Sequence, residues 1–172
     1  MKFLKLTIAS LLTSSALFAG TYNIDVSHSN VGFTVKHMMI TNVSGKFNDV
    51  AGSFEYDEKT NTLTSLSGEI IVASINTANE KRDTHLKADD IFDAEKFPKI
   101  EFKTTKIEDN AVYGDFTMKG VTKNIKLDLE NGGVITDPKG NLRAGFELTG
   151  KISRKDFGIT WNKILETGGV TV

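Results

Sequence analysis

Cysteine is absent from this chain of 172 residues, and tryptophan occurs only once. Without cysteine the protein can form no disulfide, and it offers no N-terminal cysteine to which a lipid could be attached. A hydrophobic core alone must therefore hold the fold, and the length suits one domain that can bury such a core.

The sequence also lacks an apolar run of the roughly 20 residues that a helix needs to cross a bilayer. The apolar run at 6–12 follows two lysines and is followed by small residues up to Gly20. This layout is typical of a secretory signal peptide. We therefore expect residues 1–19 to be cleaved and residues 20–172 to form a single exported barrel domain.

No basic stripe is present. The chain has 21 lysines and arginines against 22 acidic residues, and the lysines are spread among Asp and Glu along its length. Such a distribution does not neutralise a row of phosphates, so it argues against a nucleic-acid partner and against docking of a basic stripe on anionic lipid heads.

What the sequence does contain is a regular alternation of apolar and polar residues. In the segment 142–153 every second residue is apolar or small, and the segments 31–35, 112–118 and 125–129 repeat this period of two. The period predicts strands with one dry and one wet face. We expect about eight strands, near 21–27, 31–40, 43–56, 62–76, 99–107, 111–119, 121–130 and 142–153, with a partial strand after Ile164.

Turn residues separate the expected strands, at 57–61, 109–110, 131–133 and 137–140. Short connections of this kind join antiparallel neighbours. About eight antiparallel strands can close a barrel that holds either packed side chains or one slender ligand. The sequence therefore predicts an all-β fold of the antiparallel barrel type.

One segment, 77–98, breaks the strand pattern. Thr77 and Glu80 form a T-x-x-E capping box that predicts the start of a short helix, and Asp93 can cap a second turn. We expect this helical excursion to cover one mouth of the barrel.

Phenylalanine dominates the predicted interior, because Phe33, Phe54, Phe102, Phe116 and Phe146 fall on the dry faces of strands. A phenylalanine ring has no N–H or O–H group to satisfy, so a lumen lined by such rings favours a hydrocarbon guest over a sugar or a nucleotide. The same rings could instead fill a solid core, and the sequence leaves both interpretations open.

Six short motifs resemble, in order, the pattern of YceI-like proteins, and together they extend over nearly all of the expected mature chain. The motifs are Asp25-x-x-His28-Ser29-x-Val31-x-Phe33-x-Val35-Lys36-His37, Gly45-x-Phe47, Arg82-Asp83-x-His85-Leu86, Phe97-Pro98-x-Ile100-x-Phe102, Gly120-Val121-Thr122-Lys123 and Arg154-x-x-Phe157-Gly158.

The resemblance implies a lipocalin-like barrel in the periplasm whose lumen takes a long isoprenoid or similar lipid-like chain. It implies carriage or storage rather than catalysis, and we expect no cofactor other than the bound ligand. Relatives usually continue with a final strand beyond the Gly-Gly-apolar segment at 168–172, where this sequence stops. If that last strand is truncated, closure of the barrel and one wall of its lumen are affected.

These observations give a set of candidate ligand contacts. We hypothesise that Arg82, Asp83 and His85 close the mouth and contact the polar end of the ligand, with His37 as a further polar candidate. The apolar candidates for the lumen and its entrance are Phe33, Val35, Leu86, Phe92, Phe102, Phe116, Phe146, Phe157 and Trp161. Burying a methylene gains roughly 0.8 kcal/mol and head-group hydrogen bonds add only about 1–3 kcal/mol, so a long chain should draw its affinity from the lumen.

The polar candidates also have structural interpretations. Asp83 with Lys87, or His85 with Asp89, lie one helical turn apart and could pair on the helix surface, while Arg82 could tie the helix to strand carbonyls. An inward imidazole at position 37 could meet a ligand or be hydrogen-bonded within the core. The imidazole at position 28 is expected to anchor the N-terminal turn.

Two other classes of function, an enzyme and a protein-binding platform, are open alternatives. Ser27, Ser29 and the three histidines suggest a periplasmic hydrolase, but the sequence has no G-x-S-x-G elbow. A metal-dependent enzyme would need His28, His37 and His85 to converge, although they form no H-x-x-H or H-E-x-x-H motif. A barrel with a filled core could instead serve as a protein-binding platform.

We expect no stable membrane insertion, and the sequence leaves open whether two barrels pair as a homodimer.

Overall fold

The computed structural model describes residues 19–162, and in this part of the chain ten strands form two antiparallel sheets. The larger sheet has seven strands in the order β1-β4-β5-β7-β8-β9-β10, and the smaller has three in the order β2-β3-β6. The strands are β1 (Ala19–Asn23), β2 (Val31–His37), β3 (Thr41–Phe47), β4 (Val50–Asp57), β5 (Thr62–Ile71), β6 (Ile75–Asn76), β7 (Lys99–Glu108), β8 (Ala111–Met118), β9 (Val121–Thr136) and β10 (Leu142–Thr149).

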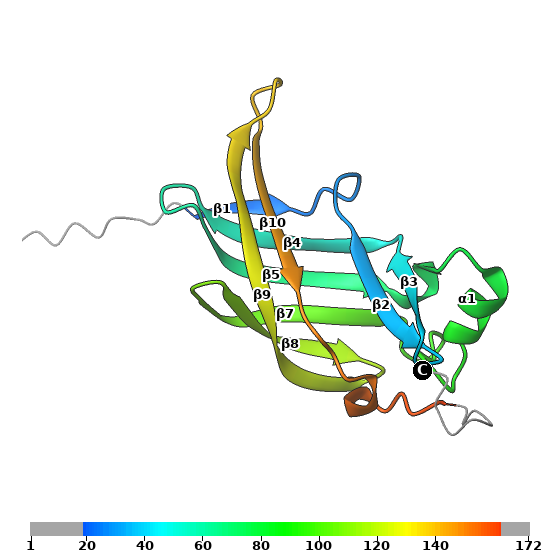
Figure 1. Cartoon of the computed structure of the whole chain (residues 1–172). Helices are drawn as coiled ribbons and strands as arrows, with labels where there is room; N and C mark the ends of the chain where they lie inside the picture. Colours follow the sequence, from blue (N-terminus) through cyan, green and yellow to red (C-terminus); the bar gives the residue numbers. More distant parts are fainter. Residues whose placement is uncertain (1–18, 163–172) are drawn as a thin grey trace, which may run out of the picture.

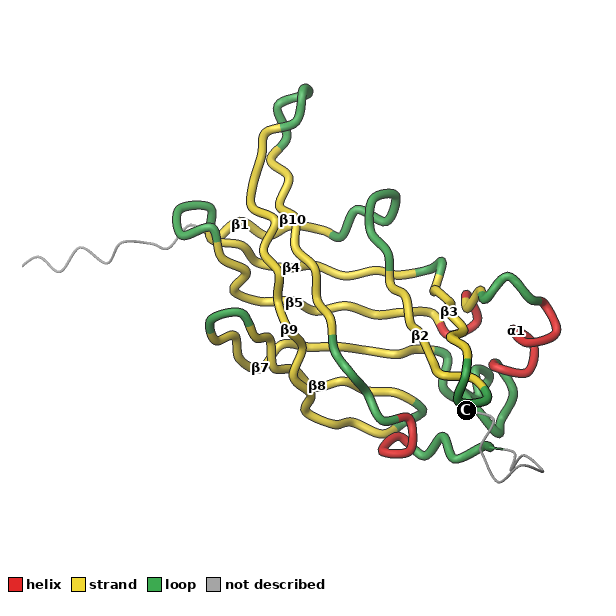
Figure 2. Tube along the Cα trace, viewed as in Figure 1, coloured by secondary structure: helices red, strands yellow, loops and turns green. Residues whose placement is uncertain are grey.

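The helical elements are short and lie at the margins of the sheets, as Figure 2 shows. They are the helix α1 (Glu80–Leu86) and the two 3₁₀ helices η1 (Val72–Ser74) and η2 (Arg154–Phe157). The α-helix follows the small sheet at one end of the molecule (Figure 1). The expected helix within the excursion 77–98 is therefore confirmed, and it is a single helix of two turns.

The large sheet is strongly curled into a half-barrel, with the β9–β10 hairpin folded over the face of β4, β5 and β7 (Figure 1). The β2–β3 hairpin covers the same face nearer to α1, and Val31 and Phe33 of β2 pack against a cluster that contains Ile100 of β7. The predicted fold class, an all-β antiparallel barrel of the lipocalin-like type, is confirmed.

The single strand predicted over 43–56 is wrong, because β3 and β4 belong to different sheets. The chain crosses between the sheets at Asn48 and Asp49. The backbone N–H of Asn48 donates to the carbonyl of Ser74 at 3.2 Å, and that of Asp49 donates to the hydroxyl of Ser74 at 3.0 Å. The strand predicted over 62–76 is divided as well. Its first part, β5, belongs to the large sheet, η1 follows, and β6 belongs to the small sheet.

The turn predicted at 131–133 is also wrong, because these residues lie inside the long strand β9. Asn131 pairs with Phe146 and Gly133 pairs with Gly145, so Gly132 is an extra residue in a β-bulge. Gly133 has a φ of 92°, which glycine adopts without a steric cost. A bulge therefore uses the same residue types as a turn. The other three predicted turns, at 57–61, 109–110 and 137–140, are confirmed.

Buried side chains gather in two clusters, one near α1 and one at the far end of the half-barrel. The cluster near α1, called the mouth cluster below, contains Phe47, Val50, Val72, Ile75, Ile91, Ile100, Met118, Phe157 and Ile159. The other, called the distal cluster, contains Phe54, Tyr56, Leu63, Val112 and Leu129. This division determines where the predicted ligand contacts lie.

Candidate functional site

The start of α1 is capped by Asn79, so the predicted capping box of Thr77 and Glu80 is wrong. The side-chain oxygen of Asn79 accepts a hydrogen bond from the backbone N–H of Arg82 at 3.0 Å. Asparagine is as strong an N-cap as a hydroxyl residue, and this cap leaves the Thr77 side chain free for another partner.

Thr77 connects α1 to the end of β6. It is buried, with 6 % of its surface exposed. The Arg82 guanidinium donates from Nε to the Thr77 hydroxyl and from Nη2 to the Thr77 carbonyl, each at 2.7 Å. The Asp83 carboxylate accepts from the Thr77 backbone N–H at 2.9 Å and from its hydroxyl. Arg82 and Asp83 therefore tether the helix, and their contact with a ligand stays a prediction.

His85 lies on the last turn of α1. Its Nε2 lies 2.9 Å from the Asp90 carboxylate, so its carboxylate partner is Asp90 and not Asp89, the alternative that the sequence offered. Its ring meets the Trp161 ring edge to face, with centroids 4.9 Å apart. Trp161 in turn packs against the mouth cluster, so two of the predicted contacts lie together beside that cluster.

The structure brings together six predicted apolar contacts and separates two others. Phe33, Leu86, Phe92, Phe116, Phe157 and Trp161 belong to or pack against the mouth cluster. Phe102 and Phe146 pack against the distal cluster, where Phe146 meets Phe54 edge to face at 5.0 Å.

Phe47 is a ring of the mouth cluster that the sequence prediction did not include as a candidate contact. Its centroid lies 5.7 Å from that of Phe33 and 6.2 Å from that of Phe92. The signal for Phe47 was present in the sequence, because it continues the dry face of Val43 and Gly45.

The inward face of β2 is half-buried along its whole length. Val31, Phe33, Val35 and His37 alternate with exposed residues, as the period of two predicts, but none of the four is buried. Within the described part of the chain, Val35 and its cross-strand partner Val43 pack against neither cluster of buried residues. The concave side therefore keeps accessible apolar surface.

The inward face of β10 has the same character. Ala144, Phe146 and Leu148 alternate with exposed residues, and all three are half-buried. The strands β2 and β10 thus each present a row of half-buried apolar side chains toward the concave side. A tightly filled barrel would bury these positions.

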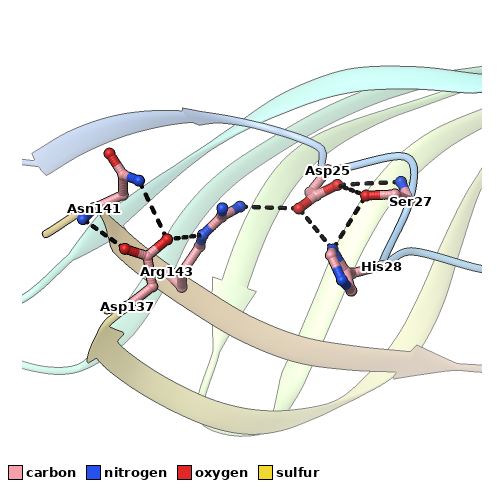
Figure 3. Close-up of polar contacts among 6 residues, drawn as sticks. All are labelled: Asp25, Ser27, His28, Asp137, Asn141 and Arg143. Atoms are coloured by element: carbon pink, nitrogen blue, oxygen red, sulfur yellow. Dashed lines mark hydrogen bonds and ion pairs between the residues drawn. The ribbon is translucent and has the colours of Figure 1, made fainter. Parts of the chain in front are cut away.

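Polar side chains link the two edge strands of the large sheet, as Figure 3 shows. The Arg143 guanidinium in β10 donates from Nη1 to the Asp25 carboxylate, just after β1, at 2.9 Å. Its Nε donates to Asp137 at 3.1 Å. One arginine therefore holds together two segments that no backbone pairing joins within the described structure.

Asp25, Ser27 and His28 form the other half of this network, and their geometry differs from that of a hydrolytic triad. The Ser27 hydroxyl and the Asp25 carboxylate both approach the same imidazole nitrogen, Nδ1 of His28, at 3.1 and 2.9 Å. A triad requires the serine and the carboxylate on opposite ring nitrogens. The Ser27 hydroxyl also donates to Asp25 at 2.6 Å. Asp25, Ser27 and His28 therefore stabilise the turn after β1, which confirms the prediction that His28 anchors the N-terminal turn.

The carboxylates of this network make a pH-dependent prediction. Hydrogen bonds from Ser27 and His28 hold the pKa of Asp25 well below its usual range. Hydrogen bonds from the backbone and side chain of Asn141, and then from Arg143, lower the pKa of Asp137 to about 2. A depressed folded-state pKa stabilises the fold above the unfolded value of about 4 and loses that contribution as the pH falls through the folded pKa.

We therefore expect the urea midpoint of unfolding to be flat above about pH 5 and to fall between about pH 4 and 2. The variant Asp137→Asn should be less stable at neutral pH and should show a flatter fall. Asp128→Asn is the matched control, because the Asp128 side chain is exposed and, among the residues that the structure describes, its carboxylate has one weak ion pair of 3.6 Å with Lys126. Equal pH profiles for the wild type and Asp137→Asn would contradict this interpretation.

Two surface hollows lie outside the concave side. One, of about 430 Å³, lies over the outer face of β4, β5, β7 and β8 and is lined mostly by polar residues such as Ser53, Glu101 and Asp115. The other, of about 550 Å³, lies between η1–β6 and α1 and includes Asn76 and Asp83 in its lining. The second hollow is lined mainly by polar atoms, which a hydrocarbon would leave without hydrogen-bond partners.

In the described range 19–162, no three or more His, Cys, Asp or Glu side chains gather as metal ligands. The three histidines lie in the turn after β1, at the end of β2 and on α1. In the same range, no helix combines the length and the apolar character needed to span a membrane.

Comparison with known proteins gives consistent matches over the described fold. The family model of the YceI-like domain matches residues 22–172. A UPF0312 protein of Staphylococcus aureus strain N315 is 40 % identical over 150 residues, which are 87 % of this chain and 88 % of the relative. The crystal structure of the YceI protein of Campylobacter jejuni superposes with a TM-score of 0.67 at 40 % identity, covering 80 % of this chain and 83 % of that one.

A more distant structure shows the same fold. The polyisoprenoid binding domain from Saccharophagus degradans superposes with a TM-score of 0.50 at 13 % identity, and the match covers 65 % of this chain and 68 % of that one.

Proposed function

This chain belongs to the YceI-like family, and we propose that it binds a long apolar ligand, an isoprenoid or a similar lipid-like chain, on the concave side of its half-barrel. The observation that carries the proposal is the half-buried apolar face of β2 and β10. Accessible apolar surface facing inward gains free energy when a hydrocarbon covers it, at roughly 25 cal/mol per Å².

The chemistry of the walls selects the class of ligand. The inward side chains Phe33, Val35, Phe102 and Phe146 offer no hydrogen-bonding group, so a sugar or a nucleotide would lose its hydrogen bonds to water without replacement. A hydrocarbon chain has no such cost. The neighbour from Saccharophagus degradans, described as a polyisoprenoid binding domain, supports the same class of ligand.

The polar residues at the mouth act mainly by holding α1 in place. Because Arg82 and Asp83 use their polar atoms on Thr77, we propose that they support the wall behind Leu86 and Phe92. His37 is the polar side chain on the inward face of β2, and the proposal assigns it the contact with the polar end of the ligand.

The setting of this function is part of the proposal. The signal peptide expected at 1–19 falls almost entirely outside the described residues, and so do the partial strand expected after Ile164 and the truncated end at 168–172. We propose that the protein is exported to the periplasm and carries or stores its ligand there. The proposal is a binding function with no chemical step.

Native mass spectrometry of protein purified from its own host tests the function. We expect a bound apolar species in near-stoichiometric amount, and organic extraction should recover a long-chain isoprenoid or lipid from the same sample. Protein with an intact fold that carries no apolar species in several preparations would overturn the proposal.

A further inference from the structure

The turn between β2 and β3 exposes three consecutive large hydrophobic residues. Met38, Met39 and Ile40 have 44 %, 62 % and 83 % of their surfaces exposed. Other exposed hydrophobic residues, such as Val26 and Ile135, are separated from one another in the sequence. Scattered apolar residues are normal on a surface, whereas a contiguous group marks an interaction site.

The backbone of this turn favours other residue types. Met38 and Met39 both lie in the left-handed region, with φ of 49° and 63°, and the Ile40 N–H donates to the His37 carbonyl at 3.2 Å to close the turn. Consecutive left-handed residues in a hairpin turn strongly favour Asn and Gly. Methionines occupy these two positions despite the steric cost.

The charge of the hairpin differs from that of the rest of the chain. From Asn30 to Asn48 there is no acidic residue, while Lys36 and Lys46 are both present. The even balance of charge over the whole sequence conceals this local excess. Lys36 lies two residues before the exposed tip, and its Nζ donates to the Asn42 side chain at 3.3 Å. Lys46 pairs with Gly32 at the base of the hairpin, so Lys36 is the cation beside the tip. An apolar tip with a lysine beside it, in a hairpin without acidic residues, complements an anionic lipid surface.

We propose that the β2–β3 tip, defined as Met38, Met39 and Ile40, docks on the surface of a bilayer that contains anionic lipids. The three side chains enter the boundary between head groups and acyl chains, while Lys36 stays at the level of the head groups. The tip lies at the same end of the molecule as α1 (Figure 1), and it follows His37 on the inward face of β2. Docking therefore places the mouth of the half-barrel next to the membrane from which an apolar ligand is taken.

This inference rests on the proposed function for its purpose, but its test does not require a bound ligand. Mature protein is mixed with vesicles of phosphatidylethanolamine and phosphatidylglycerol and separated by flotation, with phosphatidylcholine vesicles in parallel. We expect binding to the anionic vesicles, and the variant Ile40→Ser should bind about tenfold more weakly.

Ile135→Ser is the matched control, because Ile135 is 68 % exposed on the distant part of the β9–β10 hairpin. It should bind vesicles as the wild type does. Circular dichroism of both variants confirms that each is folded. Absence of wild-type binding to anionic vesicles, or equal weakening by the two substitutions, would overturn the proposal.

Sedimentation velocity of the same samples distinguishes a bilayer from a second copy of this chain. A dimer that is lost in Ile40→Ser, with no vesicle binding by the wild type, would assign the tip to self-association and overturn the membrane proposal. Mass spectrometry of the Ile40→Ser protein separates this inference from the proposed function. Bound hydrocarbon in a variant that no longer floats would leave the function intact.

Discussion

Replacing Phe157 with alanine should lower the free energy of unfolding by about 3–5 kcal/mol, the usual cost of removing a buried aromatic ring. The ring is 2 % exposed and lies at the end of η2, where it meets Phe116 of β8 edge to face with centroids 5.5 Å apart. It thereby fastens the segment that follows β10 onto the large sheet. Urea unfolding followed by circular dichroism measures the effect.

Phe146→Ala is the matched control for this prediction, because the same ring is only half-buried in β10. Its loss should destabilise the fold by clearly less, since part of its surface already faces the accessible concave side. Equal losses for the two variants would mean that the interior of the half-barrel is packed as densely at β10 as it is behind η2.

Replacing Val35 with phenylalanine should abolish most of the ligand affinity while leaving stability nearly unchanged. Val35 points inward from β2, and it packs against neither cluster of buried residues in the described structure. A larger side chain there would occupy the space in which the ligand is proposed to lie. We expect binding of a fluorescent long-chain probe to weaken by at least about tenfold and the free energy of unfolding to change by less than about 0.5 kcal/mol.

The matched control is Val112→Phe in β8, where the same change is made at a position with 0 % exposure. Overpacking a filled site typically costs about 1–3 kcal/mol. The two substitutions therefore compare the cost in stability of adding a phenylalanine ring at an open position, Val35, with the cost at a filled position, Val112. A loss of 1–3 kcal/mol for Val35→Phe as well, on the scale of overpacked cores, would show that β2 faces a solid centre.

The period of two in the sequence was sufficient to predict the fold class, but not the division into two sheets. The dry face runs through Val43, Gly45 and Phe47 and then changes phase to Val50 and Phe54. A shift of one residue in the alternation would move the apolar side chains to the opposite face of a continuous strand. The shift between Phe47 and Val50 therefore marked the position at which the chain crosses between the sheets. The hydrogen bonds to Ser74 that fix the crossing come from a residue far along the chain.

The sequence predicted the positions of those site residues whose orientation follows from the local alternation of apolar and polar residues. It did not predict the roles of residues whose partners lie far away in the sequence. Alternation placed Phe33, Val35 and His37 on the inward face of β2, as the structure confirms. The role of Arg82 depended on where the carbonyl of Thr77 lies after folding, which no spacing in the sequence reveals. The link between Asp25 and Arg143 joins residues 118 positions apart, and each is an ordinary turn or strand residue in its own segment.

The central claim is that affinity comes from an accessible apolar wall on the concave side of the half-barrel. Calorimetric titration of delipidated protein with isoprenoid alcohols of increasing length tests it most directly. Because each buried methylene contributes up to about 0.8 kcal/mol, the dissociation constant should fall with every added isoprene unit until the wall is covered, and then level off. Affinity that does not change with chain length would contradict the account.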